Sequence, residues 1–468
     1  MLVAAVGLIV RLAVFLVNAR PLFMSDSGEY LEVAHTYYLP ADRPIGVSAF
    51  FKVVLALSHD LRAIVVAHSL LGVAAAVLTV IAARLIGVRG RFATAAGLAV
   101  AVSPTMLVYE RLILAEALVV FLTVLAIVLF LSALHTGRFG RAIVAGVVVG
   151  LIATVRSNNA VVGAGLALIV LSAEWALKTW TRLGLVVALV FGAAVPVVGY
   201  AAMNYADSHG RLGEGTFTLA NFDGIALFAR VAHLTDCTQP DRPPAIRAEV
   251  CAAGDDYLGS EVDQIVWNPG PVNTALGSPD VGDKNAQLRH LALETIRQHP
   301  LTVLGEGIGT AWDDLVGQDL RYKYRAADAG YAGVIVGRYF GAAEAQKGDD
   351  GFSDWLQGAY GWWIRLRPLV WLGLLAAIVV GLVGAGRPTR MALLGIGTLV
   401  LPVGIVAIAG APGPRYVAPY EFIGFLGVSW LAQAWFARHR PFAAGDGRED
   451  IAAPRRGDDA LTATAPPV

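Results

Sequence analysis

The sequence predicts an all-α polytopic membrane protein with about ten transmembrane helices. Charged residues make up 15% of its 468 positions and hydrophobic residues 56%, whereas soluble domains carry roughly 25% charged residues. About ten mostly apolar segments also approach the roughly 20 residues that a helix needs to cross a bilayer. These two observations exclude an ordinary soluble enzyme.

Seven of the expected transmembrane segments lie in the first half of the chain and three lie near its end. They are Leu2–Val17, Leu61–Ile86, Phe92–Val108, Ile113–Leu134, Ala142–Val155, Ala160–Ala173, Leu183–Met203, Leu369–Leu382, Leu393–Ala409 and Val417–Phe436. The two segments that flank Arg156 are short, so they form either two spans or one broken helix pair inside the bundle. The first segment lacks a basic start and carries Arg11, which favours a retained helix over a cleaved signal peptide.

Basic residues alternate between the connections in a way that predicts orientation. Loops rich in Lys and Arg face the cytoplasm. Every second connection is basic, and so is the tail, through Arg89 and Arg91, Arg138 and Arg141, Lys178 and Arg182, Arg387 and Arg390, and Arg438, Arg440, Arg455 and Arg456. Both ends of the chain are therefore predicted to be cytoplasmic, and the polar chemistry to lie on the other side of a bacterial plasma membrane.

The polar stretches give the predicted domain organisation. It comprises a transmembrane module (1–203) with a catalytic first external loop (18–60), an extracytoplasmic domain (204–366), C-terminal transmembrane helices (367–437) and a disordered cytoplasmic tail (438–468). Within the first external loop, short apolar stretches such as Val47–Leu57 suit helices along the membrane interface. The external domain is expected to contain an amphipathic helix from Lys284 to His299 that Pro300 ends.

Two cysteines, Cys237 and Cys251, lie in the predicted external domain, and no CxxC or His/Cys cluster accompanies them. We therefore predict a disulfide, which would close a loop of about 15 residues and contribute roughly 3 kcal/mol in the chain-entropy model. The formal net charge is zero. A chain without excess positive charge is not expected to bind nucleic acid.

Asp26 is the first candidate for chemistry. It follows the first apolar segment closely, within Ser25-Asp26-Ser27-Gly28-Glu29-Tyr30, and is expected near the membrane surface. A carboxylate in this place either accepts a proton from a substrate or caps the helix that begins near Gly28.

Charged residues at the outer ends of other helices suggest one shared cavity at the outer interface. Glu116 stands just inside the fourth segment, where an unpaired carboxylate costs roughly 2.5 to 3.5 kcal/mol. It is either functional or a structural partner of Arg111 or Arg11. Arg156, followed by Asn158, and Arg415-Tyr416 interrupt apolar sequence at the same depth.

The order of these motifs resembles the GT-C superfamily of membrane glycosyltransferases, and within it the bacterial relatives of protein O-mannosyltransferases and aminoarabinose transferases. The motifs are the Asp26 loop, Arg43-Pro44, Ser103-Pro104 before Glu116, Thr154–Asn158 and Arg415–Pro419. The resemblance implies that Asp26 serves the acceptor and that a second acidic position falls at Glu110 or Glu116. The sequence lacks the paired Asp-Glu of the mannosyltransferase branch and its His-Pro-Pro run.

The predicted function is an inverting glycosyltransferase that moves a sugar from a polyprenyl phosphate to an extracytoplasmic acceptor. In this prediction Asp26, Glu116 and Glu110 are catalytic. The residues predicted to bind the substrates are Glu29, Tyr30, Arg43, Arg111, Arg156, Asn158, Arg415 and Tyr416. Arginine suits phosphate geometry, and the nearby carboxylates are too few to favour a divalent metal, so no cofactor is expected.

Two alternatives use the same charges differently. A transporter or lipid-linked sugar flippase would line a translocation path with them, but such a path needs polar groups near the membrane midplane. The inner halves of these segments carry almost no charge. A scaffold that keeps the fold without activity is the other alternative. The sequence does not name the sugar, the acceptor or the prenyl length.

Overall fold

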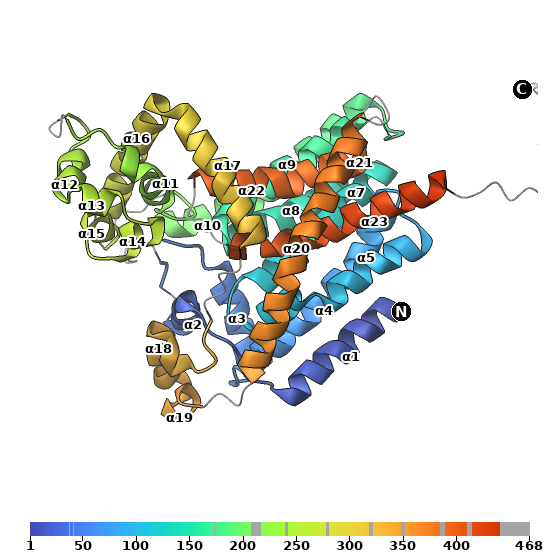
Figure 1. Ribbon diagram of the computed structural model, residues 1–468, viewed down its shortest axis with the longest axis horizontal. Coiled ribbons are helices and arrows are strands. Elements are labelled where there is room, and N and C mark those ends of the chain that lie inside the picture. Colours follow the sequence, from blue (N-terminus) through green and yellow to red (C-terminus); the bar gives the residue numbers. More distant parts are fainter. Residues whose placement is uncertain are drawn as a thin grey trace, which may run out of the picture.

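The computed structural model describes residues 1–36, 38–40, 42–172, 174–206, 217–238, 242–277, 280–317, 322–347, 352–383, 389–409 and 414–439. Its regular elements are helices, joined by two isolated β-bridges. Figure 1 shows a bundle of long helices with a group of short helices packed at one end. The predicted all-α class is confirmed. The predicted disordered tail falls outside these ranges.

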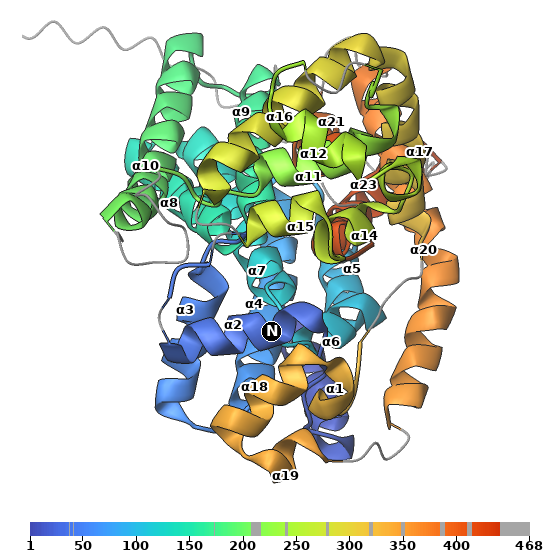
Figure 2. The ribbon, with the colours of Figure 1, turned by 90° about the vertical axis from the view of Figure 1, so that its left-hand side faces the viewer.

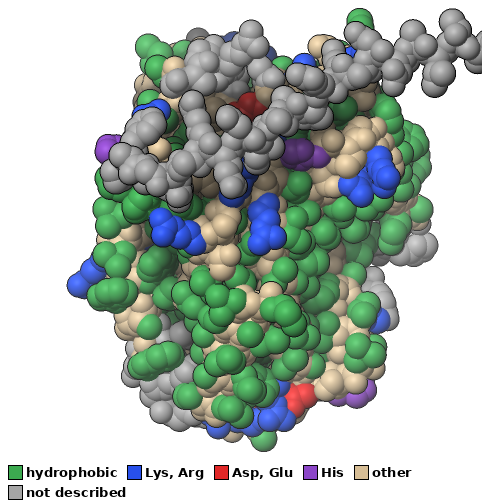
Figure 3. Space-filling model, turned by 90° about the vertical axis from the view of Figure 1, so that its right-hand side faces the viewer, with side chains coloured by type: hydrophobic (Ala, Val, Ile, Leu, Met, Phe, Trp, Pro, Cys, Tyr) green, Lys and Arg blue, Asp and Glu red, His purple; other side chains and the backbone are tan. Residues whose placement is uncertain are grey.

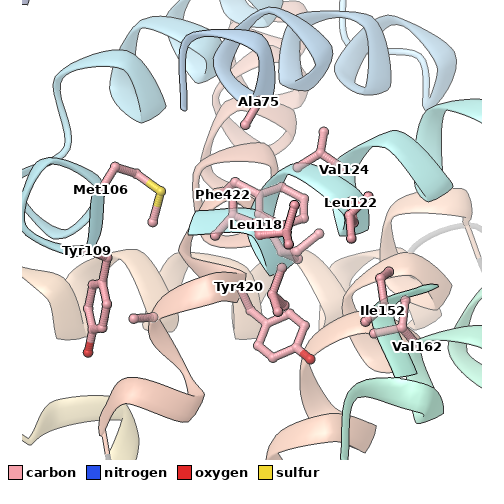
Figure 4. Close-up of a cluster of buried hydrophobic side chains, with 14 of the residues drawn as sticks. Ala75, Met106, Tyr109, Leu118, Leu122, Val124, Ile152, Val162, Tyr420 and Phe422 are labelled. Atoms are coloured by element: carbon pink, nitrogen blue, oxygen red, sulfur yellow. The ribbon is translucent and has the colours of Figure 1, made fainter. Parts of the chain in front are cut away.

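The bundle is built from long apolar helices and from several short ones that pack among them. They are α1 (Leu2–Val17), α4 (Arg62–Leu85), α5 (Gly90–Val102), α6 (Pro104–Arg111), α7 (Glu116–Thr136), α8 (Phe139–Val155), α9 (Val162–Leu168), α10 (Thr179–Ala206), α20 (Phe352–Val383), α21 (Arg390–Gly395), α22 (Leu401–Ala409) and α23 (Glu421–Arg438). Their side chains meet in one continuous core. Part of it is drawn in Figure 4, where Tyr420, Phe422 and Leu118 from distant parts of the chain lie together.

Within the described ranges, five helices are long and apolar enough to cross a membrane, or six if α5 and α6 count as one span bent by 42°. This is fewer than the ten or so expected segments. Helices α1 and α8 have 16 and 17 residues, so at 1.5 Å per residue they are a few ångströms short of the hydrocarbon thickness. The segment after Arg156 forms short pieces, η1 (Ser157–Val161), α9 and η2 (Ile169–Leu171).

The two ends of the bundle separate the two sets of connections. At one end Arg390 donates to the carbonyl oxygen of Leu85 at 3.2 Å and contacts His135 and Glu174. Gln433 accepts from the backbone N–H of Arg89 at 2.6 Å. These are the connections that the basic pattern predicts to be cytoplasmic. Figure 3 shows the right-hand side of Figure 1, where Lys and Arg side chains stand among hydrophobic ones and acidic side chains are sparse.

A small helical unit forms the group at the opposite end. It contains α11 (Asp223–Val231), α12 (Ile246–Ala252), α13 (Asp255–Leu258), α14 (Val262–Trp267), α15 (Pro271–Leu276), α16 (Val281–Gln298) and α17 (Pro300–Val316) around a core of its own. Helix α16 is the expected amphipathic helix, and α17 begins at Pro300. Cys237 and Cys251 form the predicted disulfide, with Cα atoms 5.6 Å apart.

Two further short helices cover the first external loop. Helices α18 (Tyr331–Phe340) and α19 (Ala342–Ala345) do not join the core of the small unit, and α18 packs against α2 (Ser25–Thr36). Figure 2 shows α18 beside α2, with α3 (Gly46–Leu57) next to α2 on the other side. The two helices of the first external loop, α2 and α3, are therefore held between the bundle and a segment three hundred residues later in the chain.

Candidate active site

Backbone hydrogen bonds fix the start of the first external loop. Leu22 donates to the carbonyl of Arg111 at 2.8 Å, and Ile113 donates back to Leu22 at 3.1 Å. Phe23 and Lys323 exchange two bonds of 2.8 and 2.6 Å. Residues 22 and 23 thus join the turn before α7 to the segment before α18, and α2 starts two residues later.

Asp26 lies in the first turn of α2 and its carboxylate faces two arginines. Its Oδ2 accepts from Nη1 of Arg415 at 2.7 Å, and its Oδ1 lies 3.5 Å from Nη1 of Arg43. At the same helix end, Ser27 Oγ accepts from the backbone N–H of Met24 at 2.9 Å. The carboxylate of Asp26 is therefore engaged with cations.

Arg43 gathers three carboxylates. Besides Asp26, its Nη2 lies 2.6 Å from Asp42 and 3.0 Å from Glu29. Its guanidinium also lies 5.4 Å from the ring centre of Tyr30. Glu29 and Tyr30 therefore belong to the same cluster as Asp26, as the sequence predicts.

The guanidinium groups of Arg156 and Arg415 both lie close to the ring of Tyr416. Arg156 ends α8 and donates to Oε1 of Glu116, the first residue of α7, at 2.9 Å. Its guanidinium lies 4.2 Å from the ring centre of Tyr416, and that of Arg415 lies 5.2 Å from it. Both arginines are partly exposed.

The structure gives Glu116 and Glu110 different surroundings. Glu116 is ion-paired, but with Arg156, so the suggested pairing with Arg111 or Arg11 is wrong. Glu110 instead accepts from Arg11 of α1 at 2.5 Å, and Arg111 donates to the carbonyl of Arg20. Glu110 and Glu116 both line a cavity of about 10 Å³, about the volume of one water. Helix α6 turns the carboxylate of Glu110 towards α1, away from the arginine pair.

Three contacts around the cluster were not expected from the sequence. Asp42 shares Arg43 with Glu29 and Asp26, and its position directly before Arg43 was the available signal. Asn159, next to the predicted Asn158, accepts from the hydroxyl of Tyr420 at 2.8 Å. Glu32 accepts from the hydroxyls of Tyr38 and Tyr331 and lies 3.5 Å from Arg338, which no local pattern in the sequence indicated.

Burial and neighbouring charges lower the pKa of Asp26 and raise the pKa of Glu29, two acidic residues of α2. Burial alone raises the pKa of Asp26, but Arg415 and Arg43 outweigh it and hold that pKa well below the ordinary value. Burial raises the pKa of Glu29 to about 7 against the attraction of Arg43, with repulsion from Asp42 and Asp26 adding to the rise. Burial likewise raises the pKa of Tyr30 to about 12. Asp26 is therefore ionised at neutral pH, whereas Glu29 binds a proton at a higher pH than an ordinary glutamate does.

A larger cavity of about 630 Å³ opens beside the cluster, between α2, α3 and the end of α10. Most of its lining is apolar, and the residues are Val33, Ala34, Tyr38, Leu39, Ile45, Ser48, Ala49, Lys52, Val53, Met203 and Ala206. Ile45, two residues after Arg43, donates its backbone N–H to the hydroxyl of Tyr200 on α10 at 3.2 Å. The apolar cavity and the charged cluster therefore share the short segment from Arg43 to Ile45.

Among the described residues, no three His, Cys, Asp or Glu side chains are grouped as metal ligands. The carboxylates of the cluster are instead occupied by arginines. The cluster therefore consists of ion pairs, a glutamate with a raised pKa (Glu29), and two arginines (Arg156 and Arg415) close to the ring of Tyr416.

Part of the chain is similar to a known protein family. Residues 42–199 match the model of the dolichyl-phosphate-mannose-protein mannosyltransferase family. No curated protein sequence matches the chain. Two solved structures from Archaeoglobus fulgidus resemble it. One is an oligosaccharyltransferase tethered to an acceptor peptide with the NVT sequon, and the other is the oligosaccharyltransferase AglB in complex with an inhibitory peptide and a dolichol-phosphate.

These two structures are 13% and 12% identical to the chain, each with a TM-score of 0.47, and the matches cover 93% and 94% of it. They cover 49% and 51% of the archaeal chains, so the protein spans about half the length of each. The family match includes Arg43, Glu110, Glu116 and Arg156, which carry much of the charged network. In sequence, residues 42–199 are therefore similar to the dolichyl-phosphate-mannose-protein mannosyltransferase family.

Proposed function

We propose that the protein is an inverting glycosyltransferase that moves a sugar from a polyprenyl phosphate to a hydroxyl group of an extracytoplasmic acceptor. One observation carries the proposal. Asp26, Arg43, Arg156 and Arg415, which lie far apart in the sequence, meet in one cluster at the end of the bundle. A carboxylate beside two partly exposed arginines supplies both a proton acceptor and an anion site.

The donor phosphate would lie against Arg156 and Arg415. Guanidinium groups bind phosphate oxygens through paired, charge-assisted hydrogen bonds, and the shared contact with Tyr416 keeps the two groups facing one site. The ion pair with Glu116 holds the guanidinium of Arg156 in place. The same two cations would stabilise the negative charge that develops on the phosphate as it leaves.

Asp26 would take the proton of the acceptor. The acceptor oxygen forms a bond to the anomeric carbon while the bond from that carbon to the phosphate oxygen breaks, and the hydroxyl proton passes to the carboxylate. The polyprenyl phosphate leaves with the electron pair of the broken bond, and this single displacement inverts the anomeric centre. A phosphate on Arg415 competes with Asp26 for that guanidinium, so donor binding frees one carboxylate oxygen for the acceptor.

The prenyl chain would use the apolar cavity between α2, α3 and α10. Its wall begins at Ile45, next to the Arg43-Pro44 step, and its residues match a hydrocarbon chain in polarity. The family description, which names a dolichyl phosphate sugar as the donor of the related enzymes, supports the same class of donor. Membrane lipids supply the surroundings in which such a chain is presented.

The test is donor binding by purified protein in lipid nanodiscs, with a panel of polyprenyl-phosphate sugars. Replacing Arg156 or Arg415 by alanine removes charge-assisted hydrogen bonds worth about 1.5 to 3 kcal/mol. The dissociation constant is therefore expected to rise roughly tenfold or more. Arg62→Ala is the control, because Arg62 forms an exposed ion pair with Asp60 near the same face. Unchanged donor affinity in both alanine variants would contradict the assignment.

A further inference from the structure

Helix α17 exposes an apolar surface that the other described residues leave uncovered. Leu301, Leu304, Ile308 and Trp312 are 81%, 48%, 65% and 48% exposed. Their spacing of three, four and four residues places them on one side of a helix with 3.6 residues per turn. We call this the α17 face.

Charged residues stay away from the α17 face. Successive residues of a helix turn by about 100°, so Glu306, Asp313 and Asp314 each fall more than about 100° from the centre of the face. Glu306 lies 3.1 Å from His233 of the small unit, and Asp314 is buried. The acidic residues of α17 therefore lie on the side of the helix opposite the α17 face.

The inner side of α17 is firmly attached to the bundle. A Cβ atom at Gly307 would lie 2.8 Å from the side chain of Ile408 on α22, so the two helices touch. At the C-terminal end, the carbonyl oxygen of Leu315 accepts from Arg367 at 3.1 Å and from Trp371 at 3.0 Å. Both donors belong to α20. The exposure of the α17 face is thus a property of a fixed helix.

Helix α17 packs against two candidate spans that also expose apolar side chains. Helix α20 exposes Leu369 and Leu372, and the helix formed by α21 and α22 exposes Val400 and Ile405. Helix α17 packs against both α20 and α22, and Figure 1 shows it crossing α22 and ending beside α20. Exposed apolar side chains are therefore present on α17 and on both of the helices that it packs against.

We propose that the α17 face is inserted into the hydrocarbon of the outer leaflet, so that α17 seats the small helical unit on the membrane. The occupant of this face is lipid. Seventeen residues extend about 25 Å, too short to cross the bilayer, which leaves an interfacial position. Trp312 at the end of the face suits the boundary between hydrocarbon and head groups.

This position has a consequence for the site. Helix α17 also packs against η6 (Pro414–Tyr416), the segment that carries Arg415. A helix that rests on the lipid surface sets the depth of η6, and with it the height of Arg415 relative to the lipid head groups. The inference does not depend on the identity of the donor or on catalysis.

Spin labels on single cysteines test the proposal in the full chain. The native cysteines are joined to each other, so a new cysteine is a unique labelling site without reducing agent. Labels at Leu304→Cys and Ile308→Cys are compared in lipid nanodiscs with two controls. Val379→Cys on the exposed apolar side of α20 reports lipid, and Glu261→Cys on the exposed surface of the small unit reports water.

Collisions with oxygen and with a water-soluble nickel complex distinguish the outcomes. We expect the two α17 labels to show the high ratio of oxygen to nickel collisions of the Val379 label. A ratio equal to that of the Glu261 label would place the face in water and overturn the proposal. Protection from both reagents would mean a protein partner or a second copy of the chain covers the face, which overturns it as well.

Discussion

Asp26 and Glu29 stand one turn apart on α2 and both contact Arg43, yet their pKa values move in opposite directions. Asp26 has a second guanidinium, Arg415, at 2.7 Å, which lowers its pKa after the cost of burial is met. Glu29 has only a share of Arg43 and lies near two other carboxylates. The cluster therefore separates one firmly ionised acid from one that exchanges its proton near neutral pH.

The raised pKa of Glu29 predicts that the free energy of unfolding depends on pH in the range from about 5 to about 7. Its pKa rises from 4.5 to about 7 on folding, so between these values the folded protein binds more protons than the unfolded chain. Stability therefore falls as the pH rises from about 5 to about 7, by up to about 1.4 kcal/mol per pH unit. Asp26 does not interfere, because its lowered pKa gives a contribution that is constant above about pH 5 and is lost only in stronger acid.

The measurement is the thermal midpoint of wild type and of Glu29→Gln at pH 5.5 and pH 8. Glutamine cannot ionise, so the fall in the midpoint across this range should be smaller in the variant than in wild type. Glu261→Gln, on an exposed glutamate, should behave as wild type. A parallel fall in Glu29→Gln would show that Glu29 does not titrate in this range.

At the scale of elements, close backbone approaches hold the first external loop against the bundle. A Cβ atom at Gly28 of α2 would lie 2.8 Å from the backbone nitrogen of Ala332 on α18. A Cβ atom at Gly46, the first residue of α3, would lie 2.5 Å from the carbonyl oxygen of Thr154. Thr154 precedes Arg156 by two residues, so the fit of α3 on α8 positions the arginine that ends α8.

Gly46→Ala is therefore expected to push α3 away from α8. Overpacking of this kind costs typically 1 to 3 kcal/mol, so the thermal midpoint should fall and donor affinity should weaken with it. Gly199→Ala is the matched control, because Gly199 lies in α10 and has open space around its Cβ position. Equal midpoints and equal donor affinity for the two variants would show that the approach of α3 to α8 does not position Arg156.

The sequence predicts these elements better than their contacts. Apolar stretches identified α3 and most of the long helices, and Pro300 marked the end of α16. The packing of α18 on α2 could not be predicted, because the Glu32 and Tyr331 pair joins positions 299 residues apart and neither residue belongs to a recognisable local pattern. The expected count of about ten spans stays a prediction, because apolar composition alone does not show whether helices as short as α1 and α8 cross the membrane.

At the scale of the whole molecule, the membrane depth that the sequence predicts for each charged residue indicated which residues could lie close together. Asp26 and Arg415, 389 residues apart, were both expected at the outer ends of helices, and they form an ion pair. The pattern could not choose partners. From the sequence, Arg111 or Arg11 was the suggested ion-pair partner of Glu116. In the structure α6 is bent away from α5, Arg11 forms an ion pair with Glu110, and Glu116 forms one with Arg156.

The central claim is that this cluster transfers sugar with Asp26 as the proton acceptor, and the rate of sugar transfer by Asp26→Asn tests it most directly. Asparagine keeps the size of the side chain but loses its affinity for a proton, and general-base assistance contributes about 10² to 10⁴ in rate. Asp60→Asn, on an exposed carboxylate of the same loop region, controls for the loss of a charge.

Both variants are purified in nanodiscs, shown to be folded at the assay temperature, and supplied with a polyprenyl-phosphate sugar that wild type transfers. The account predicts that Asp60→Asn transfers as wild type does and that Asp26→Asn is slower by at least about 10², the lower limit for general-base catalysis. A folded Asp26→Asn protein that transfers sugar at a rate within a few-fold of wild type would contradict it.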